Sequence, residues 1–201
     1  MLELLTGAGL AASAGLNAYI PLLALGLLSR YTSLVDLPAD WHWLSNGWVM
    51  IILGLLLAVE LVADKIPAVD HVNDILQTLI RPTAGGLVFA AGSTAETAGV
   101  RDPGDFFASH QWIPLVTGLL MALVVHGAKA AARPVINTMT VGVGAPVVST
   151  VEDGASVGLS FAAILLPVLV AVLLIALVLA MVLLWRWRQQ RRLTRTTSAA
   201  G

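Results

Sequence analysis

Residues 60–82 read ELVADKIPAVDHVNDILQTLIRP, and this segment is the densest polar stretch of the chain. It holds four of the twelve acidic residues of a chain that is only 11% charged. Pro67 ends or bends the preceding apolar helix. From Asp70 to Arg81 polar residues recur at helical spacing with apolar residues between them, which predicts an amphipathic helix.

The overall composition is that of a membrane protein. The 201 residues are 58% hydrophobic, with a mean hydropathy of +0.87, whereas soluble domains are about one-quarter charged. The net charge of -1 provides no basic field, so nucleic acid is excluded as a partner. The absence of cysteine excludes disulfides, thiolate metal sites and cysteine nucleophiles.

Hydropathy predicts an all-α, polytopic bundle of five or six transmembrane spans. A helix needs about 20 apolar residues to cross a bilayer core. Segment 83–100 contains Glu96 and is only weakly apolar, so it must be surrounded by protein if it spans. Pro167 is the expected kink in the last span. The predicted spans are residues 4–29, 47–63, 83–100, 111–128 and 158–184.

The cations are compatible with either number of crossings. With five, the N-terminus and the internal cations lie outside. With six, Pro134–Thr150 also crosses, these cations lie inside, and Val151–Ala155 forms an external turn. Either way Glu152 and Asp153 are expected in a surface turn before the last span. The internal cations concerned are Lys65, Arg81, Lys129 and Arg133.

The C-terminal end is predicted to be cytoplasmic. After the single integral domain of residues 1–185, the tail 186–201 is basic and expected to be disordered. Its arginines follow a tryptophan at headgroup level and are expected to attract anionic lipid headgroups. These are Arg186, Arg188, Arg191, Arg192 and Arg195.

The sequence also predicts an internal repeat at an offset of 64. It aligns residues 48–103 with 112–167, so that Trp48 meets Trp112 and Lys65 meets Lys129. Each unit contains a span, a lysine at its end and an amphipathic or half-membrane segment. Many secondary transporters are built from such duplicated units.

The first predicted span carries two features that favour helix contacts. Gly7, Ala11 and Gly15 form a small-residue stripe, which lets another helix approach closely. Asn17 is placed near the middle of the span and is followed by Pro21. The Asn17 amide either satisfies a backbone or neighbouring-helix group, or contacts a ligand at a broken helix.

Two interpretations of the helix at residues 70–81 remain open. It lies flat at the membrane surface, or it enters the protein so that Asp64, Asp70, Asp74 and Arg81 line a polar cavity. In the second case we predict a helical hairpin in which Arg81 pairs with Asp64 or Asp70. Asp74 is then left without a cation.

Two segments resemble those of a known family. The segments are AGLNAY at residues 14–19, and the DKIP motif at 64–67 with RP at 81–82. In them the chain is similar to a widespread bacterial family of multi-pass membrane proteins labelled as a domain of unknown function. The resemblance covers residues 5–175 and implies a bacterial cytoplasmic membrane protein without a known substrate.

The sequence offers no enzyme, metal or cofactor signature, because nucleophile and phosphate-binding motifs and paired histidines are missing. The first functional hypothesis is a small, permease-like transporter, with protons as a coupling ion. The alternative is a membrane protein that organises lipids or partner proteins, and a homo-oligomer is compatible with both. The hypothesised substrate-binding residues are Asn17, Asp64, Lys65, Asp70, Asp74, Arg81 and Glu96.

Overall fold

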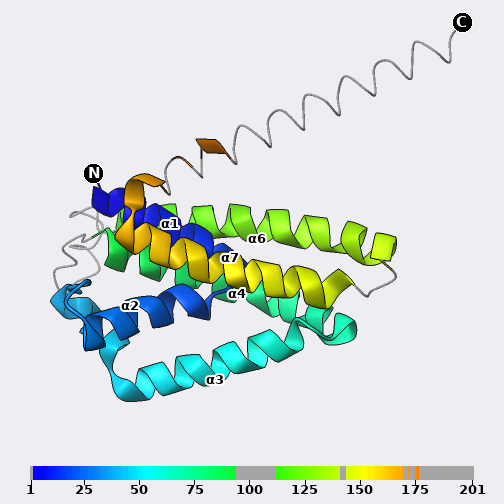
Figure 1. Ribbon diagram of the computed structural model, residues 1–201, viewed down its shortest axis with the longest axis horizontal. Coiled ribbons are helices and arrows are strands. Elements are labelled where there is room, and N and C mark those ends of the chain that lie inside the picture. Colours follow the sequence, from blue (N-terminus) through cyan, green and yellow to red (C-terminus); the bar gives the residue numbers. More distant parts are fainter. Residues whose placement is uncertain (1, 94–111, 141–143, 170–171, 173–174, 177–201) are drawn as a thin grey trace, which may run out of the picture.

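The computed structural model describes residues 2–93, 112–140, 144–169, 172 and 175–176, without the side chains of 67–68, 70–72, 137 and 139. In this part every regular element is a helix, which confirms the all-α class (Figure 1). The basic tail and Glu96 lie outside the described residues. The helices are α1 (Leu2–Leu16), α2 (Tyr19–Tyr31), η1 (Ala39–Ser45), α3 (Gly47–Ala63), α4 (Pro67–Gly92), α6 (Trp112–Thr140) and α7 (Gly144–Leu165).

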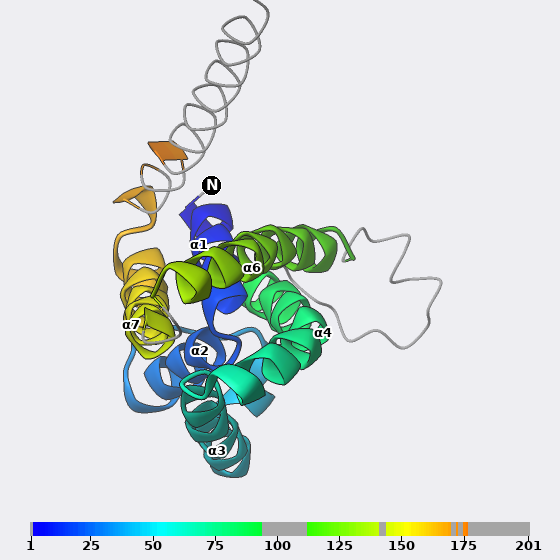
Figure 2. The ribbon, with the colours of Figure 1, turned by 90° about the vertical axis from the view of Figure 1, so that its right-hand side faces the viewer.

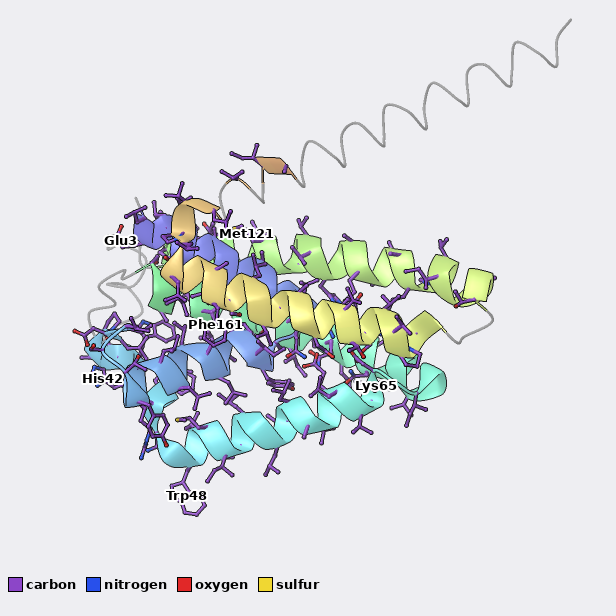
Figure 3. The ribbon with its side chains drawn as sticks, in the orientation of Figure 1. Glu3, His42, Trp48, Lys65, Met121 and Phe161 are labelled. Carbon is purple, nitrogen blue, oxygen red and sulfur yellow. The ribbon has the colours of Figure 1, made fainter. Side chains whose placement is uncertain are left out.

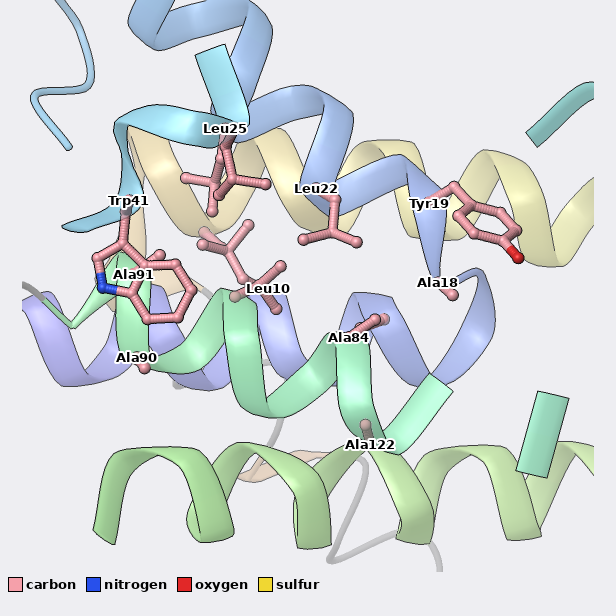
Figure 4. Close-up of a cluster of buried hydrophobic side chains, with 14 of the residues drawn as sticks. Leu10, Ala18, Tyr19, Leu22, Leu25, Trp41, Ala84, Ala90, Ala91 and Ala122 are labelled. Atoms are coloured by element: carbon pink, nitrogen blue, oxygen red, sulfur yellow. The ribbon is translucent and has the colours of Figure 1, made fainter. Parts of the chain in front are cut away.

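The prediction of one continuous span over residues 4–29 is wrong, because the chain breaks after α1 and runs back as α2 (Figures 1 and 4). Asn17 makes the break. Its Oδ1 accepts hydrogen bonds from the backbone N–H groups of Tyr19 and Ile20, at 3.1 and 3.3 Å, and so caps α2. Pro21 is placed in the first turn of α2, where its missing N–H costs nothing. Each helix is about 20 Å long and too short to cross a bilayer alone.

Helix α3 begins and ends where hydropathy predicts, and Pro67 ends the connection to α4. Ile66 is extended, as a residue before proline prefers, and Pro67 begins α4 in the first turn. The amphipathic helix predicted for residues 70–81 is the first half of α4, which continues through Pro82 to Gly92.

The C-terminal helices differ from the arrangement predicted for six crossings. Segment 134–150 is not a separate span, because residues 134–140 extend α6 and residues 144–150 begin α7. Segment 151–155 is not an external turn but lies within α7. The helix is interrupted at Leu166, directly before Pro167, where the kink is expected. The number of crossings remains a prediction.

Helix α1 is at the centre of the bundle and packs against α4, α6 and α7 (Figure 2). The small-residue stripe allows this close packing, as predicted. A Cβ on Gly7 would lie 2.9 Å from the carbonyl oxygen of Phe89, and one on Gly15 would lie 2.6 Å from Cβ of Val125. Where α4 crosses α6, Gly118 rests directly on the backbone of Gly85. Glycines thus let helix backbones touch.

An apolar core fills the end of the bundle where α1 and α3 begin. Leu10, Leu25 and Leu44 are almost completely buried there, and Trp41 closes the core from η1 (Figure 4). Most other members are alanines, several of them on α4, which keep the helices close together. This core fixes the helix positions on which the polar side chains further along the bundle depend.

The outer surface is apolar. Trp48 is the most exposed of the large apolar side chains on α3, and it projects away from the bundle (Figure 3). By length and composition, residues 112–136 of α6 and all of α7 are able to cross a membrane, and η1 with α3, bent by 59°, forms a third candidate. Large exposed side chains cover the outer face of α3: Trp48, Ile51, Ile52, Leu55, Leu56, Val59 and Val62.

The repeat remains a prediction. Both units contain a helical hairpin, α3 with α4 and α6 with α7. The turn after Ala63 corresponds by the offset to residue 127, however, where α6 continues without a break.

Candidate functional site

Seven charged side chains from α3, its C-terminal turn, α4, α6 and α7 meet inside the bundle, and we call this group the ion network. All of them are buried or nearly so, with side chains at most 16% exposed. Three are cations and four are acids. The ion network consists of Glu60, Asp64, Asp74, Arg81, Lys129, Arg133 and Glu152.

Arg81 is the fully buried cation of α4. Its Nη2 donates to Oε1 of Glu60 at 2.8 Å and lies 3.5 Å from Oδ2 of Asp64. Glu60 projects inward from α3, one turn before Asp64, so both carboxylates lie on one face of the helix. The predicted hairpin therefore exists and Arg81 contacts Asp64, but its closest partner is Glu60.

Asp64 is the central acid, with three cations around it. Besides Arg81, Nζ of Lys129 and Nη2 of Arg133 lie 3.4 and 3.2 Å from Oδ2 of Asp64. Oδ1 accepts a hydrogen bond from Asn73 at 2.7 Å. Burial opposes the charge, but the three cations outweigh it, so the pKa of the Asp64 carboxyl lies below its ordinary value.

Glu152 of α7 joins the other side of the ion network. Its Oε2 lies 3.0 Å from Nζ of Lys129 and 2.9 Å from Nη2 of Arg133. Lys129 also donates to the carbonyl oxygen of Leu16, at the C-terminal end of α1, at 3.0 Å. The expectation that Glu152 lies in a surface turn is wrong, since α7 turns it inward toward α6.

Asp74 has the weakest pairing in the ion network. Arg81 and Arg133 each place a nitrogen 3.8 Å from one of its oxygens, so the prediction that Asp74 has no cation is wrong. Neither contact is a hydrogen bond. Burial raises the pKa of the Asp74 carboxyl above its ordinary value, and Arg81 offsets this only in part. Asp64 and Asp74 lie outside the candidate spans.

His126 connects α6 with α4 as a neutral ring. Nη1 of Arg81 donates to its Nδ1 at 3.1 Å, so Nδ1 carries no proton. The remaining ring nitrogen, Nε2, then holds the hydrogen and donates it to Oγ1 of Thr78 at 3.1 Å. Thr78 passes its own hydroxyl hydrogen to the backbone oxygen of Asp74 at 2.9 Å. His126 therefore orients Arg81 without adding charge.

The ion network lies deep in the bundle. Lys129 is placed eleven residues before the end of α6 at Thr140, which is about 16 Å by the helix rise, and further from the beginning at Trp112. Nitrogen and oxygen atoms gather here, beneath α7, on the side where Lys65 is labelled (Figure 3). Charged groups buried inside a membrane protein are expensive and are as a rule functional.

The break between α1 and α2 lies beside the ion network. Nδ2 of Asn17 donates to Oδ1 of Asp153 on α7 at 3.0 Å. One turn further along the α1–α7 contact, Oγ of Ser13 hydrogen-bonds both Ser156 and Ser160, at 2.7 Å each. Asn17 thus satisfies backbone groups of α2 and a side chain of α7, which confirms the first of its two predicted uses. Contact with a ligand stays a prediction.

The structure brings together only some of the predicted site residues. Asp64, Asp74 and Arg81 are in the ion network and Asn17 borders it. Lys65 does not belong to it, because its side chain is exposed and donates to the carbonyl oxygen of Leu61 at 3.0 Å. Since Lys65 follows Asp64 by one position, it points to another side. Two further predicted residues, Glu96 and the side chain of Asp70, lie outside the described part.

Four members of the ion network were not among the predicted site residues, namely Glu60, Lys129, Arg133 and Glu152. A signal for some of them exists in the sequence, because His126, Lys129 and Arg133 recur at i, i+3 and i+7 in an otherwise apolar helix and so share one face. Within the described residues, no group of three or more His, Asp or Glu side chains is arranged to hold a metal ion.

An apolar exterior around buried ion pairs, with helices long and apolar enough to cross a membrane, is typical of a helical membrane protein with a polar interior. The chain belongs to the family described as Domain of unknown function (DUF4126), which matches residues 4–187. No curated protein and no solved structure matches the chain.

Proposed function

We propose that this protein is a small permease-like transporter of the cytoplasmic membrane, in which the ion network is the polar site that a solute or coupling ion enters. The observation that supports this is the ion network itself. It places seven charged side chains behind an apolar surface, in a chain with 23 charged residues in all.

Energetics favour a functional over a structural use of these charges. A buried ion pair is often no more stabilising than apolar residues of the same volume, because both charges lose their hydration. Packing alone therefore gives no reason to keep three cations and four acids inside the bundle. A site that alternately binds and releases charge needs such groups.

The surrounding helices offer a means of opening the site. Two helix ends meet the ion network, the break at Asn17 and the turn after Asp64, and both resemble the discontinuous helices at transporter binding sites. Backbone groups at such ends are free to bond with side chains, as the bond from Lys129 to Leu16 illustrates. A shift of the α1–α2 hairpin against α7 would uncover the ion network.

The test is the accessibility of Asn73, which is half-buried and bonded to Asp64. The chain has no cysteine, so Asn73→Cys provides a unique label site. A membrane-impermeant maleimide should label it in both right-side-out and inverted vesicles. Val59→Cys, on the exposed face of α3, is the control and should be labelled from neither side. Labelling of Asn73→Cys from only one side contradicts transport.

A second function, the organisation of lipids, is favoured by a different observation. An open apolar groove of about 290 Å³ lies between α2 and α4 and is suited to an acyl chain. Leu79→Trp should fill it and reduce the lipid that remains bound in native mass spectrometry, whereas Leu55→Trp on α3 should not. The lining residues are Leu22, Leu79, Ile80, Thr83, Ala84 and Leu87.

A further inference from the structure

One buried acid, Asp153, is not part of the ion network. Helix α7 turns a polar face toward α1, with residues at positions 149, 153, 156 and 160 at helical spacing. Ser156 and Ser160 are bonded to Ser13. Asp153 and Ser149, by contrast, each keep one buried oxygen without a hydrogen-bond partner.

The carboxyl of Asp153 has little to stabilise a negative charge. The residue is 8% exposed, its Oδ1 accepts the bond from Asn17, and its Oδ2 has no partner. Among the described residues, no nitrogen of a lysine, arginine or histidine lies within 4.0 Å of it. A carboxylate buried without a counter-ion takes up a proton rather than remain charged.

The neighbouring charges are already used. Lys129 of α6 acts on Asp153 only from beyond 4.0 Å, and its Nζ lies 3.0–3.4 Å from Leu16, Asp64 and Glu152, which account for its three hydrogens. The α3–α4 turn contributes Asp64, which is paired, and Lys65, which is exposed.

The other elements that pack against α7 add no charge at this position. From α1 and α2, the side chain that contacts Asp153 is the uncharged Asn17. On α7 itself, Glu152 points to Lys129 and Arg133. None of the described neighbours is therefore available as a counter-ion for Asp153.

We infer that Asp153 is a proton-binding site, with the proton on Oδ2, in the arrangement of helices described here. Uptake converts the carboxylate and a proton from water into a neutral carboxylic acid, and release returns the proton to water. Because Asn17 joins Asp153 to the break between α1 and α2, a change of charge at Asp153 acts on the hairpin. Its use as the coupling proton rests on the proposed function, whereas its protonation does not.

A metal cation is a poorer occupant. The nearby oxygens are engaged, since Oδ1 of Asn17 accepts two backbone hydrogens and the Ser13, Ser156 and Ser160 hydroxyls bond one another. Asp153 and Ser149 alone supply too few oxygens for a hard cation, which takes six or more.

Infrared difference spectroscopy of the full chain in liposomes tests the inference. The wild type should show a C=O stretching band of a protonated carboxylic acid that disappears as the pH is raised. Asp153→Asn should lack this component, and Asp153→Glu should shift its position and its titration. Asp36→Asn, an exposed acid outside the ion network, is the matched control and should retain the component unchanged.

Three outcomes would overturn the inference. They are an unchanged band in Asp153→Asn, an unshifted band in Asp153→Glu, and loss of the wild-type band on addition of sodium at constant pH, which would assign the site to a metal cation. Failure of the proposed function has a different signature. In that case Asn73→Cys is labelled from one side only, while the Asp153 band persists.

Discussion

The two halves of α4 face two different interiors. Residues 84–92 pack alanine and glycine against α1 and α6, and Gly85 touches the backbone of Gly118. Residues 73–81 instead carry Asn73, Asp74 and Arg81 into the ion network. Both halves are helical, but residues 84–92 are buried or half-buried throughout, whereas residues 73–81 also expose an apolar face.

The apolar half of α4 holds the helices together, whereas the polar half serves the proposed function. The apolar half brings backbones together through small residues, and dispersion across that contact stabilises the bundle. Each charge of the polar half loses its hydration, and attraction to an opposite charge offsets that free-energy cost. We therefore expect the apolar half to fail when volume is added and the polar half to fail when one partner of a pair is removed.

The largest expected effect is that of Arg81→Met. It leaves Glu60 buried without its closest cation and removes a contact of Asp64, which should cost about 3–5 kcal/mol. Denaturant unfolding of the purified protein in detergent measures the loss. A variant as stable as the wild type would show that Arg81 does not pair inside the bundle.

The double variant Glu60→Met/Arg81→Met is the matched control for that experiment. It removes one acid and one cation together, so the net charge of the ion network is unchanged. Most of the stability lost in Arg81→Met should return. No recovery in the double variant would contradict the pairing of these two residues.

The apolar half is tested by adding one methyl group at the crossing of α4 and α6. Gly118→Ala pushes a Cβ into the backbone of Gly85 and should destabilise the protein by about 1–3 kcal/mol. Gly127→Ala, on the same helix with open space around it, should be neutral or slightly stabilising. Equal unfolding midpoints for the two variants would contradict the close crossing.

A smaller effect distinguishes two acids of the ion network by pH. Asp64 has a lowered pKa, so its contribution to stability is complete above the ordinary value of 3.8 and is lost as the pH falls below it. Asp74 has a raised pKa, so its contribution is complete below 3.8 and is lost as the pH rises through the folded-state value.

The melting temperatures of the two variants should therefore change in opposite directions relative to the wild type. Asp64→Asn should be destabilised near neutral pH and approach the wild type in acid. The melting temperature of Asp74→Asn should rise relative to that of the wild type as the pH rises. Parallel curves for the two variants, measured in detergent from about pH 3 to 8, would show that the two carboxyls share one environment.

The smallest effect is expected at the serine contact of α1 and α7. Ser13→Ala and Ser160→Ala, combined in a double-mutant cycle, should give a coupling energy of about 0.6 kcal/mol, as for other interhelical hydrogen bonds in membranes. A coupling energy near zero would mean that Ser13 and Ser160 do not bond.

The sequence predicts the parts of this fold that depend on local chemistry. Hydropathy defines α3, and Pro67 places the turn that follows. The small-residue stripe at Gly7 and Gly15 predicts a close contact, but does not say with which helix. Asn17 is recognisable as an unusual residue in a span, yet only the structure shows that the chain reverses there.

The members of the ion network are harder to predict because they depend on long-range packing. The predicted hairpin assigns Arg81 to Asp64 or Asp70. The closest acid to Arg81 is instead Glu60, because α3 turns this side chain toward α4. Asp153 is followed by Gly154, Ser156 and Gly158, which suit a turn, and its burial depends on the contact of α7 with α1. Neither outcome is encoded in a local pattern.

The central claim is that the ion network serves function and not cohesion. The most direct test is two-sided maleimide labelling of Asn73→Cys in the Glu60→Met/Arg81→Met background, with the unfolding midpoint measured on the same protein. We predict that the midpoint stays at or near the wild-type value and that labelling from one side is lost, because the charges that allow the site to open are gone. Unchanged labelling from both sides, or a double variant as unstable as Arg81→Met, would contradict the claim.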